Sequence, residues 1–251
     1  MKAAGENSAA ADPAQGSDRK TALGEALRRR IVNMELAPGA LIDEAGLAEE
    51  FGMSRPPIRE LIRQMAAEGY IELETNRAPR VSSMNFQSLR SFFLAAPLIY
   101  VATTQLAALN ATPDDIARLK AIQLHFRTAI ENNDVAARVI YNDAFHLEIG
   151  RIAQNDYLMP SLRRLLIDHA RLGKMFYRYP TTSTMQQTLE TAVVQHDQII
   201  EAIEQHDADQ AGLLVREHFE LSRRRMTEYA APQGMAVSVN LEDPVLDRDR
   251  G

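Results

Sequence analysis

The chain has 251 residues, of which 45% are hydrophobic, and carries a formal net charge of −6. This length is sufficient for two domains with separate cores. The absence of cysteine excludes disulfides and thiolate metal sites and favours a cytoplasmic location. No continuous apolar run approaches the roughly 18 residues of a membrane span, and the acidic balance excludes indiscriminate nucleic-acid binding. We therefore expect a soluble protein without a membrane partner.

The N-terminal region divides into a polar tail and a first helix. Residues 1–20 are small and polar and lack the apolar segment of a secretory signal, so they are expected to be a disordered tail. Residues 21–34 follow as a helix with an apolar face made of Leu23, Ala26, Leu27 and Ile31. The run from Arg28 to Arg30 is expected to be solvated, with contact to DNA phosphate as the alternative.

The stretch from 41 to 70 has the pattern of two helices joined by a turn. Asp43 is an N-cap candidate for the first helix, and Gly52 tolerates the positive φ expected past its end. Ser54 is the cap candidate for the second helix, whose first turn holds Pro56 and Pro57. Its apolar stripe is Ile58, Leu61, Ile62, Met65 and Ala66, and another face carries Arg55, Arg59 and Arg63. This pattern predicts a helix-turn-helix that reaches phosphates or guanine edges in the major groove; the alternative is an αα-corner with solvated arginines.

A hairpin is expected directly after these helices. Residues 69–74 alternate apolar with polar, residues 75–79 (TNRAP) have turn composition, and residues 80–82 return as a second strand. The hairpin would form the wing of a winged helix-turn-helix over residues 21–83, with Arg77 at its tip. Residues 21–82 contain eight Arg against ten acidic side chains. Because that balance is acidic, DNA contact must be local to the second helix and the wing, which hold five of those Arg.

Residues 84–230 are expected to be helical throughout, and residues 231–251 are expected to be a second disordered tail. Periodicity and caps predict six helices at about 86–109, 113–132, 135–153, 156–177, 185–205 and 208–229. The fold class is therefore mainly α, with an N-terminal winged helix-turn-helix, a small β-hairpin wing and an all-α helical bundle behind it.

Histidines on three of these helices suggest a metal site in the bundle. Asn142 and His146 stand four residues apart and share a face, while His196 and His218 lie midway along the last two helices. Helices that each present a ligand side chain near mid-length can assemble such a site in a bundle core. Nitrogen and oxygen donors suit a divalent ion such as zinc, nickel, manganese or iron. The alternative is that each histidine is half-buried and held by one hydrogen bond.

The stretch ALRRRIVNMELAPGALIDEAGLAEEFGMSRPPIRELIRQMAAEGYIE resembles the DNA-binding domain of the GntR family of bacterial transcription regulators. The resemblance implies contact with double-stranded operator DNA through the start of the second helix and the wing tip, namely Ser54, Arg55, Pro56, Arg59 and Arg77. At the wing tip, TNRAP stands where relatives often have a Gly-rich turn.

The helical segment is similar to the FCD (FadR C-terminal domain) subfamily. Its metal-binding members use an Asp or Asn four residues before the His of a Phe-His pair, and then two further His. The motifs NDAFH, QHDQII and REHFEL imply the ligand set Asn142, His146, His196 and His218, with zinc as the first candidate. Asn142 in place of Asp removes one negative charge, and Asp143 is an alternative oxygen ligand. Outside this pattern, and expected to be structural, are His125, His169 and His206.

An effector pocket is implied on the first helix of this segment, where relatives carry an Arg and a Glu. This chain has Ala96 and Tyr100 there, with Pro97 between them. We take Tyr100 and Arg171 as candidate effector contacts, with an exposed or salt-bridged role as the alternative for Arg171.

The function implied is that of a homodimeric, ligand-responsive regulator, a repressor released by a small organic acid bound at the metal. One alternative is a sensor of an acyl thioester or fatty acid without a metal. Others are a metal-dependent enzyme on the bundle and a winged helix that serves protein contacts alone. No catalytic residue is predicted.

Overall fold

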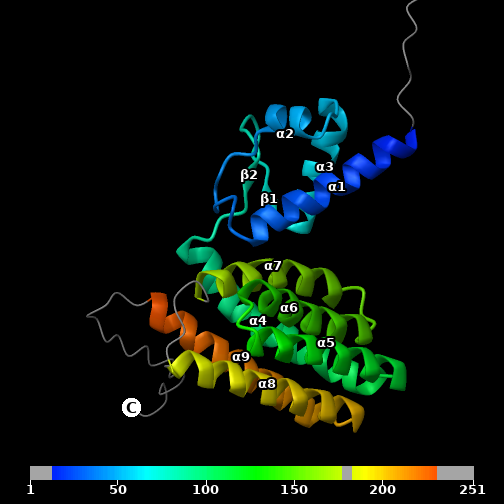
Figure 1. Ribbon diagram of the computed structural model, residues 1–251, viewed down its shortest axis with the longest axis vertical. Helices are drawn as coiled ribbons and strands as arrows, with labels where there is room; N and C mark the ends of the chain where they lie inside the picture. Colours follow the sequence, from blue (N-terminus) through cyan, green and yellow to red (C-terminus); the bar gives the residue numbers. More distant parts are fainter. Residues whose placement is uncertain (1–12, 177–182, 231–251) are drawn as a thin grey trace, which may run out of the picture.

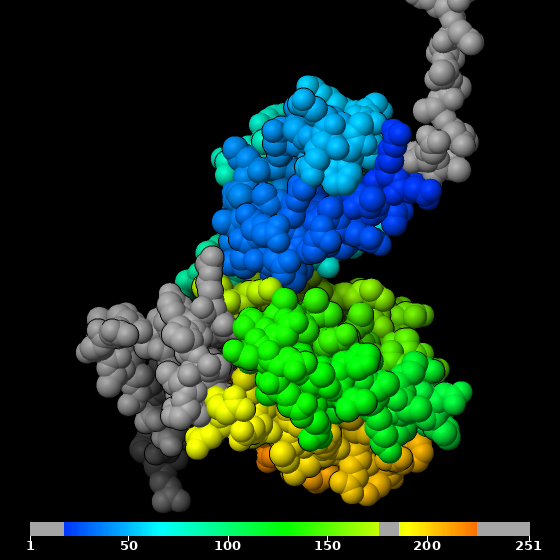
Figure 2. Space-filling view, viewed as in Figure 1, coloured from blue at the N-terminus to red at the C-terminus, as the bar shows by residue number. Residues whose placement is uncertain are grey.

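The computed structural model describes residues 13–176 and 183–230, and these form two lobes joined over a narrow region (Figures 1 and 2). The N-terminal lobe contains α1 (Pro13–Val32), α2 (Glu44–Glu50), α3 (Arg55–Glu68), β1 (Ile71–Glu72) and β2 (Arg80–Val81). The C-terminal lobe contains α4 (Phe86–Asn110), α5 (Pro113–Glu131), α6 (Val135–Ile152), α7 (Leu158–Phe176), α8 (Ser183–Glu204) and α9 (Ala208–Ala230). The predicted fold class is confirmed, and the six helix positions of the second lobe agree with the prediction to within a few residues.

The N-terminal lobe is a three-helix core with a short hairpin. β1 and β2 are antiparallel, with Ile71 opposite Val81, and both residues join the buried core of the helices. The turn of the hairpin points away from the helical lobe (Figure 1). The hairpin therefore has the position of a wing beside α3.

Helix α1 begins at Pro13, so the prediction that residues 13–20 belong to a disordered tail is wrong. The extension is held by contacts that local sequence does not reveal. Arg19 donates to the carbonyl of Gly52 at 3.2 Å, and Lys20 pairs with Glu60 at 2.9 Å. Residues 1–12 and 231–251, the rest of the predicted tails, lie outside the described residues.

The arginines at the end of α1 are structural rather than solvated, which corrects the prediction for Arg28 and Arg30. Arg28 makes a bidentate pair with Glu68 at 2.9–3.0 Å, which ties α1 to α3. Arg30 pairs in the same way with Glu50 beside the end of α2.

Two of the predicted caps in the helix-turn-helix form, and one does not. Asp43 accepts from the backbone N–H groups of residues 45 and 46, and Gly52 has φ +59°. Ser54 occupies the N-cap position of α3, but its side chain makes no capping hydrogen bond. A cap accepts from the second or third helical N–H, and those positions are Pro56 and Pro57, which have none. The Ser54 hydroxyl is thus left exposed at the start of α3.

Helix α4 is the central helix of the second lobe. It packs against α6, α7, α8 and α9, and its buried side chains include Phe92, Ala96 and Tyr100. By length and hydropathy alone α4 is the one helix of the described chain that could cross a membrane, although the core helix of a soluble protein has the same properties. One face of it remains exposed, with Leu94 and Leu98 at 60% and 70% of their full accessibility.

Helix α7 connects the two lobes through a buried arginine. It lies on the side of the bundle that faces α1 and α3 (Figure 1). Arg171 is fully buried and donates to the carbonyl oxygen of Ser82 at 2.6 Å and to its hydroxyl at 2.9 Å. The same guanidinium pairs with Asp168 at 3.0 Å. Since Ser82 follows β2 directly, this contact fixes the end of the wing against the helical lobe.

A glycine permits the second close contact between the lobes. Gly69 ends α3 with φ +93°, and a Cβ atom at this position would lie 1.9 Å from Cδ of Arg164 on α7. Backbone conformation and space therefore both favour glycine at this position.

Replacement of Arg171 by Met is expected to destabilise the protein by about 3 kcal/mol. This is the low end of the range for breaking a buried ion pair, because Arg164 still reaches Asp168 at 3.1 Å. Chemical denaturation monitored by circular dichroism measures the change. Arg163→Met, at an exposed position of the same helix, is the matched control and should stay within about 0.5 kcal/mol of wild type. Equal stability of the two variants would contradict the structural role of Arg171.

Candidate metal centre and nucleic-acid interface

Three buried imidazoles converge in the core of the helical lobe. His146 comes from α6, His196 from α8 and His218 from α9, with exposed fractions of 2%, 0% and 4%. One ring nitrogen of each lies within 4.8 Å of those of the other two. The Nε2 atoms of His196 and His218 are 3.1 Å apart. The structure thus brings together three of the four predicted metal ligands.

Neighbouring side chains set the orientation of two of these rings. His196 stacks on the ring of Phe145, with centroids 4.0 Å apart, and its Nδ1 lies 3.0 Å from Oε1 of Gln123. The Nδ1 of His218 lies 3.0 Å from Oε1 of Gln195. An amide oxygen only accepts, so the Nδ1 of His196 carries the proton when its contact with Gln123 forms, and the Nε2 of His196 is left with a lone pair.

Burial keeps these imidazoles neutral. It lowers the pKa of His146 and of His196 well below the ordinary value, and neighbouring imidazoles add to the shift. It lowers the pKa of His218 to about 3. Neutral imidazole is the form that ligates metals, so the lone pairs are available at neutral pH.

The geometry fits a divalent cation. The Nε2 of His146 is buried without a hydrogen-bond partner within the described chain, and such an atom normally costs stability. The separation of 3.1 Å between the other two Nε2 atoms is near the roughly 3.3 Å expected for two nitrogens on one tetrahedral zinc. Without a cation, two facing Nε2 atoms are compatible only if one carries a proton. A metal ion would satisfy all three nitrogens together.

A tyrosine and a fourth histidine stand beside the cluster. The Tyr100 hydroxyl is hydrogen-bonded to Nδ1 of His169 at 2.8 Å, and the Tyr100 ring lies 4.7 Å from the ring of His146. Burial raises the pKa of Tyr100 and lowers that of His169 to about 4, so both groups are neutral. His169 was expected to be only structural, but the structure places it within 5.6 Å, ring to ring, of His146. Its place on the buried face of α7 beside Leu166 was the available sequence signal.

The candidate oxygen ligands, Asn142 and Asp143, and a buried arginine lie on α6. Asn142 stands one turn before His146 and is half-buried, and its side chain is hydrogen-bonded to Asp143. Burial raises the pKa of Asp143, and in the described part of the chain its carboxylate is not part of the close group of ligand atoms. Arg138, one further turn back on the same face, is 2% exposed, and sequence analysis missed it. Its spacing of four from Asn142 was the signal that could have found it.

Arg171 does not have the position predicted for an effector contact. Its hydrogen bonds are to Ser82 and Asp168, as described above, so the alternative of a salt-bridged role fits the structure. The reason is tertiary, because Ser82 is 89 residues away in the chain. The remaining histidines are elsewhere: His125 is exposed against Tyr141, and His206 bonds to the carbonyl of Ala108 at 2.7 Å.

The start of α3 presents exposed polar groups. Ser54, Arg55 and Pro56 are all exposed, and within residues 13–176 and 183–230 Arg55 has no hydrogen-bond or ion-pair partner. Arg59, one turn later and 54% exposed, pairs with Glu44 at 2.9 Å. Exposed ion pairs are weak, so phosphate can replace Glu44 as the partner of Arg59 at small cost.

The wing presents a second basic group. Arg77 is 66% exposed at the hairpin turn and pairs with Glu74, three residues before it. Arg80 on β2 donates to the carbonyl of Gly39 at 3.2 Å. The wing tip is therefore accessible, although its arginine has an acidic neighbour.

The buried imidazoles should make the metal-free protein sensitive to acid. For His169 the folded pKa of about 4 lies below the unfolded value of about 6.5, so the unfolded chain binds more protons between these values. Its contribution to stability is complete above about pH 6.5 and falls by about 2 kcal/mol on lowering the pH to about 5. Denaturation of chelator-treated protein at both pH values should show a smaller loss in His169→Gln than in wild type. The raised pKa of Asp143 acts in the opposite sense in both proteins and cancels in this comparison. Equal losses of stability in wild type and His169→Gln would refute the low folded pKa of His169.

Comparison with known proteins agrees with this two-part arrangement. The family model described as bacterial regulatory proteins, gntR family, matches residues 19–81, and the FCD domain model matches residues 98–221. The chain is 24% identical over 194 residues to the HTH-type transcriptional repressor RspR of Escherichia coli K12, covering 77% of this chain and 82% of the relative. It is 25% identical over 251 residues to the Uxu operon regulator of Haemophilus influenzae, covering 90% of this chain and 85% of that protein.

The fold has solved counterparts. The structure of McbR/YncC of E. coli superposes with a TM-score of 0.71 at 18% identity, over 84% of this chain and 98% of the other. A GntR regulator from Rhodococcus sp. RHA1 superposes with a TM-score of 0.65 at 14% identity, again over 84% and 98%. The two matched models, the relatives and the winged helix followed by a helical bundle all point to one family. The chain therefore belongs to the gntR family of bacterial regulatory proteins and is a DNA-binding transcription regulator with an FCD domain.

Proposed function

We propose that this regulator is a repressor whose operator affinity falls when a small organic acid binds at a divalent metal in the helical lobe. The metal would be held by Asn142, His146, His196 and His218, with zinc as the first candidate and nickel, manganese or iron as alternatives. The observation that carries the proposal is the convergence of three neutral, buried imidazole nitrogens, one of them without a polar partner. Response to the effector would be a shift between two arrangements of the DNA-binding lobes.

The neighbours of the cluster favour a compact anionic effector. A bound divalent ion supplies positive charge, and an ion that takes five or six ligands keeps positions open for a carboxylate beside the four protein ligands. Arg138 lies two turns from His146 on the same face of α6, and a guanidinium suits bidentate binding of a second carboxylate. Tyr100, beside His146, is the remaining candidate contact. A long acyl thioester or fatty acid would instead need an apolar cavity, whereas the buried histidines and Arg138 supply polar groups.

The same geometry does not favour catalysis. The carboxylate nearest in sequence, Asp143, is hydrogen-bonded to Asn142, and its pKa is raised by burial. Burial favours the protonated carboxyl group, which cannot accept a proton, and the relatives are named as regulators. The role as a repressor rests on the name of RspR.

A homodimer in the cytoplasm is the proposed working form. A single DNA-binding lobe makes few base contacts, so a two-fold dimer on a palindromic operator supplies the specificity. Helix α4 offers an apolar face for it, since Phe86, Leu94, Leu98 and Leu109 are exposed within one arc of the helix. The apolar character of α4 is then explained by burial on both of its faces rather than by a membrane.

Metal content tests the coordination proposal. Protein purified without chelator should contain about one divalent ion per chain, and His196→Ala should lose most of it because one of three nitrogen donors is gone. Elemental analysis by mass spectrometry measures both. His125→Ala, at an exposed histidine outside the cluster, is the matched control and should retain the metal. Metal that is absent from wild type, or equal in wild type and His196→Ala, counts against the site.

Substitution of the arginines at the start of α3 tests the proposed DNA contacts. Arg55→Ala combined with Arg59→Ala should weaken binding to the DNA upstream of the protein's own gene by tenfold or more, since each bidentate base contact contributes about 1–3 kcal/mol. The dependence of affinity on salt should also become shallower, as phosphate contacts are lost. Fluorescence anisotropy over a salt series measures both effects. Arg216→Ala, at an exposed position of α9, is the control, and selective binding that survives the double change would exclude this surface as the reader of the operator.

A further inference from the structure

Gln123 is a buried polar side chain whose contacts are all directed at the histidine site and its surroundings. It lies on α5 and is 3% exposed. Its Nε2 donates to the carbonyl of Val193 at 2.9 Å and to Oδ1 of Asp197 at 3.0 Å. Its Oε1 lies 3.0 Å from Nδ1 of His196. Every polar atom of this amide is therefore engaged, and each partner lies on α8.

These contacts fix which way the amide points. The Val193 carbonyl and the Asp197 carboxylate are both acceptors, so the side of Gln123 that faces them must be the NH₂ group. The amide oxygen must then face His196. An oxygen acceptor requires a hydrogen on Nδ1 of His196, and a neutral imidazole carries only one such hydrogen. The Nε2 of His196 is left as a lone pair directed towards His218, 3.1 Å away.

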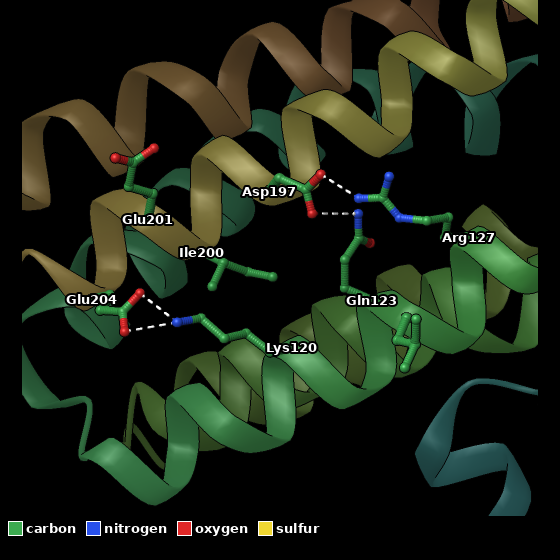
Figure 3. Close-up of a pocket in the computed structure, with 8 residues that line it drawn as sticks. Lys120, Gln123, Arg127, Asp197, Ile200, Glu201 and Glu204 are labelled. Carbon is green, nitrogen blue, oxygen red and sulfur yellow. Dashed lines mark hydrogen bonds and ion pairs between the residues drawn. The ribbon is translucent and has the colours of Figure 1, made fainter.

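The chain of contacts continues to the surface. Asp197 also accepts from Arg127 at 2.7 Å, and both are about half exposed. Figure 3 shows Gln123 and Arg127 on α5 reaching Asp197 on α8. These three residues line a pocket of about 450 Å³, across which Lys120 and Glu204 form a second ion pair. Exposed ion pairs contribute little, so the buried amide is the strongest part of this chain of contacts.

We infer that Gln123 is a positioning residue that selects the Nδ1–H form of His196 and thereby directs its Nε2 lone pair into the shared site with His146 and His218. This inference rests on the proposed metal-binding function and adds a residue on a fourth helix, α5, to it. Without Gln123, the proton of His196 is free to occupy Nε2, hydrogen-bonded to His218. Nε2 would then be unable to ligate a metal until that proton left.

The test compares three variants. Gln123→Met keeps the length of the side chain and removes both polar groups. Gln123→Glu is made together with Asp197→Asn, because the Gln123 amide nitrogen lies 3.0 Å from the Asp197 carboxylate and two carboxylates would otherwise face each other. It keeps an oxygen acceptor for His196 but has no donor for the Val193 carbonyl, so it restores the positioning role and not the structural bond. Gln198→Met, at an exposed position on α8, is the control. Imidazole nitrogen chemical shifts of His196 in metal-free protein report the tautomer, and calorimetric titration with zinc alone reports the affinity.

We expect Gln123→Met to lose the Nδ1–H form and to bind zinc about 10- to 100-fold more weakly, as found for groups that hydrogen-bond to metal ligands. Gln123→Glu should retain the tautomer and most of the affinity, and Gln198→Met should match wild type. A Gln123→Met protein with the wild-type tautomer and affinity overturns the inference. If that variant does not fold by circular dichroism, Gln123→Glu decides, since loss of the Nδ1–H form there also overturns it.

The design separates this inference from the proposed function. If wild type fails to bind zinc, the coordination proposal fails, while the tautomer measured without metal still decides the role of Gln123. If wild type binds zinc and Gln123→Met binds it equally, the coordination proposal stands and the positioning role is refuted.

Discussion

The buried guanidinium of Arg171 is the contact on which the arrangement of the two lobes depends. It is fully buried between α7 and the end of the wing, and its charge is balanced by Asp168 and by the carbonyl of Ser82. A charge in such a place is stable only while its partners stay, so separating the wing from α7 at this contact is costly. Two residues before Arg171, His169 bonds to Tyr100 beside the histidine cluster. The histidine cluster and the end of the wing are thus in contact with the same helix, α7.

The histidine cluster depends on burial in a different way. Burial keeps its imidazoles neutral and so preserves the lone pairs, but it also removes the water that would satisfy them. The aromatic ring of Phe145 and the amide of Gln123 hold His196 so that its free nitrogen faces the others. The apolar core of the bundle thus contains a group of imidazole nitrogens that need a shared proton or a cation between them.

In the DNA-binding lobe the candidate contacts are exposed on the surface, in contrast to the buried histidines. Its core fixes α3 through Ile58, Ile62 and Met65, while the ion pairs of α1 with Glu50 and Glu68 use much of the local basic charge. The chain is acidic as a whole, so the few accessible arginines at the start of α3 and at the wing tip define where a polyanion can approach.

Local sequence determined the helices, the hairpin and the histidines of the site. Thr112 and Asp115 form the capping box that begins α5, and Asn155 accepts from two N–H groups at the start of α7, because such contacts span only a few residues. The spacing of Asn142 and His146 places them on one face for the same reason. Even the failed cap at Ser54 was present in the sequence, in the two prolines that follow it.

Only the tertiary structure decided which distant side chains meet. Gln123 reaches His196 across 73 residues, Tyr100 reaches His169 across 69, and Arg171 reaches Ser82 across 89. None of these pairs leaves a periodic or spacing signal, because a hydrogen bond between helices depends on how they pack and not on either helix alone. The sequence by itself therefore determined the fold class and the residue types of the site, whereas helix packing determined the partners, protonation and exposure of each one.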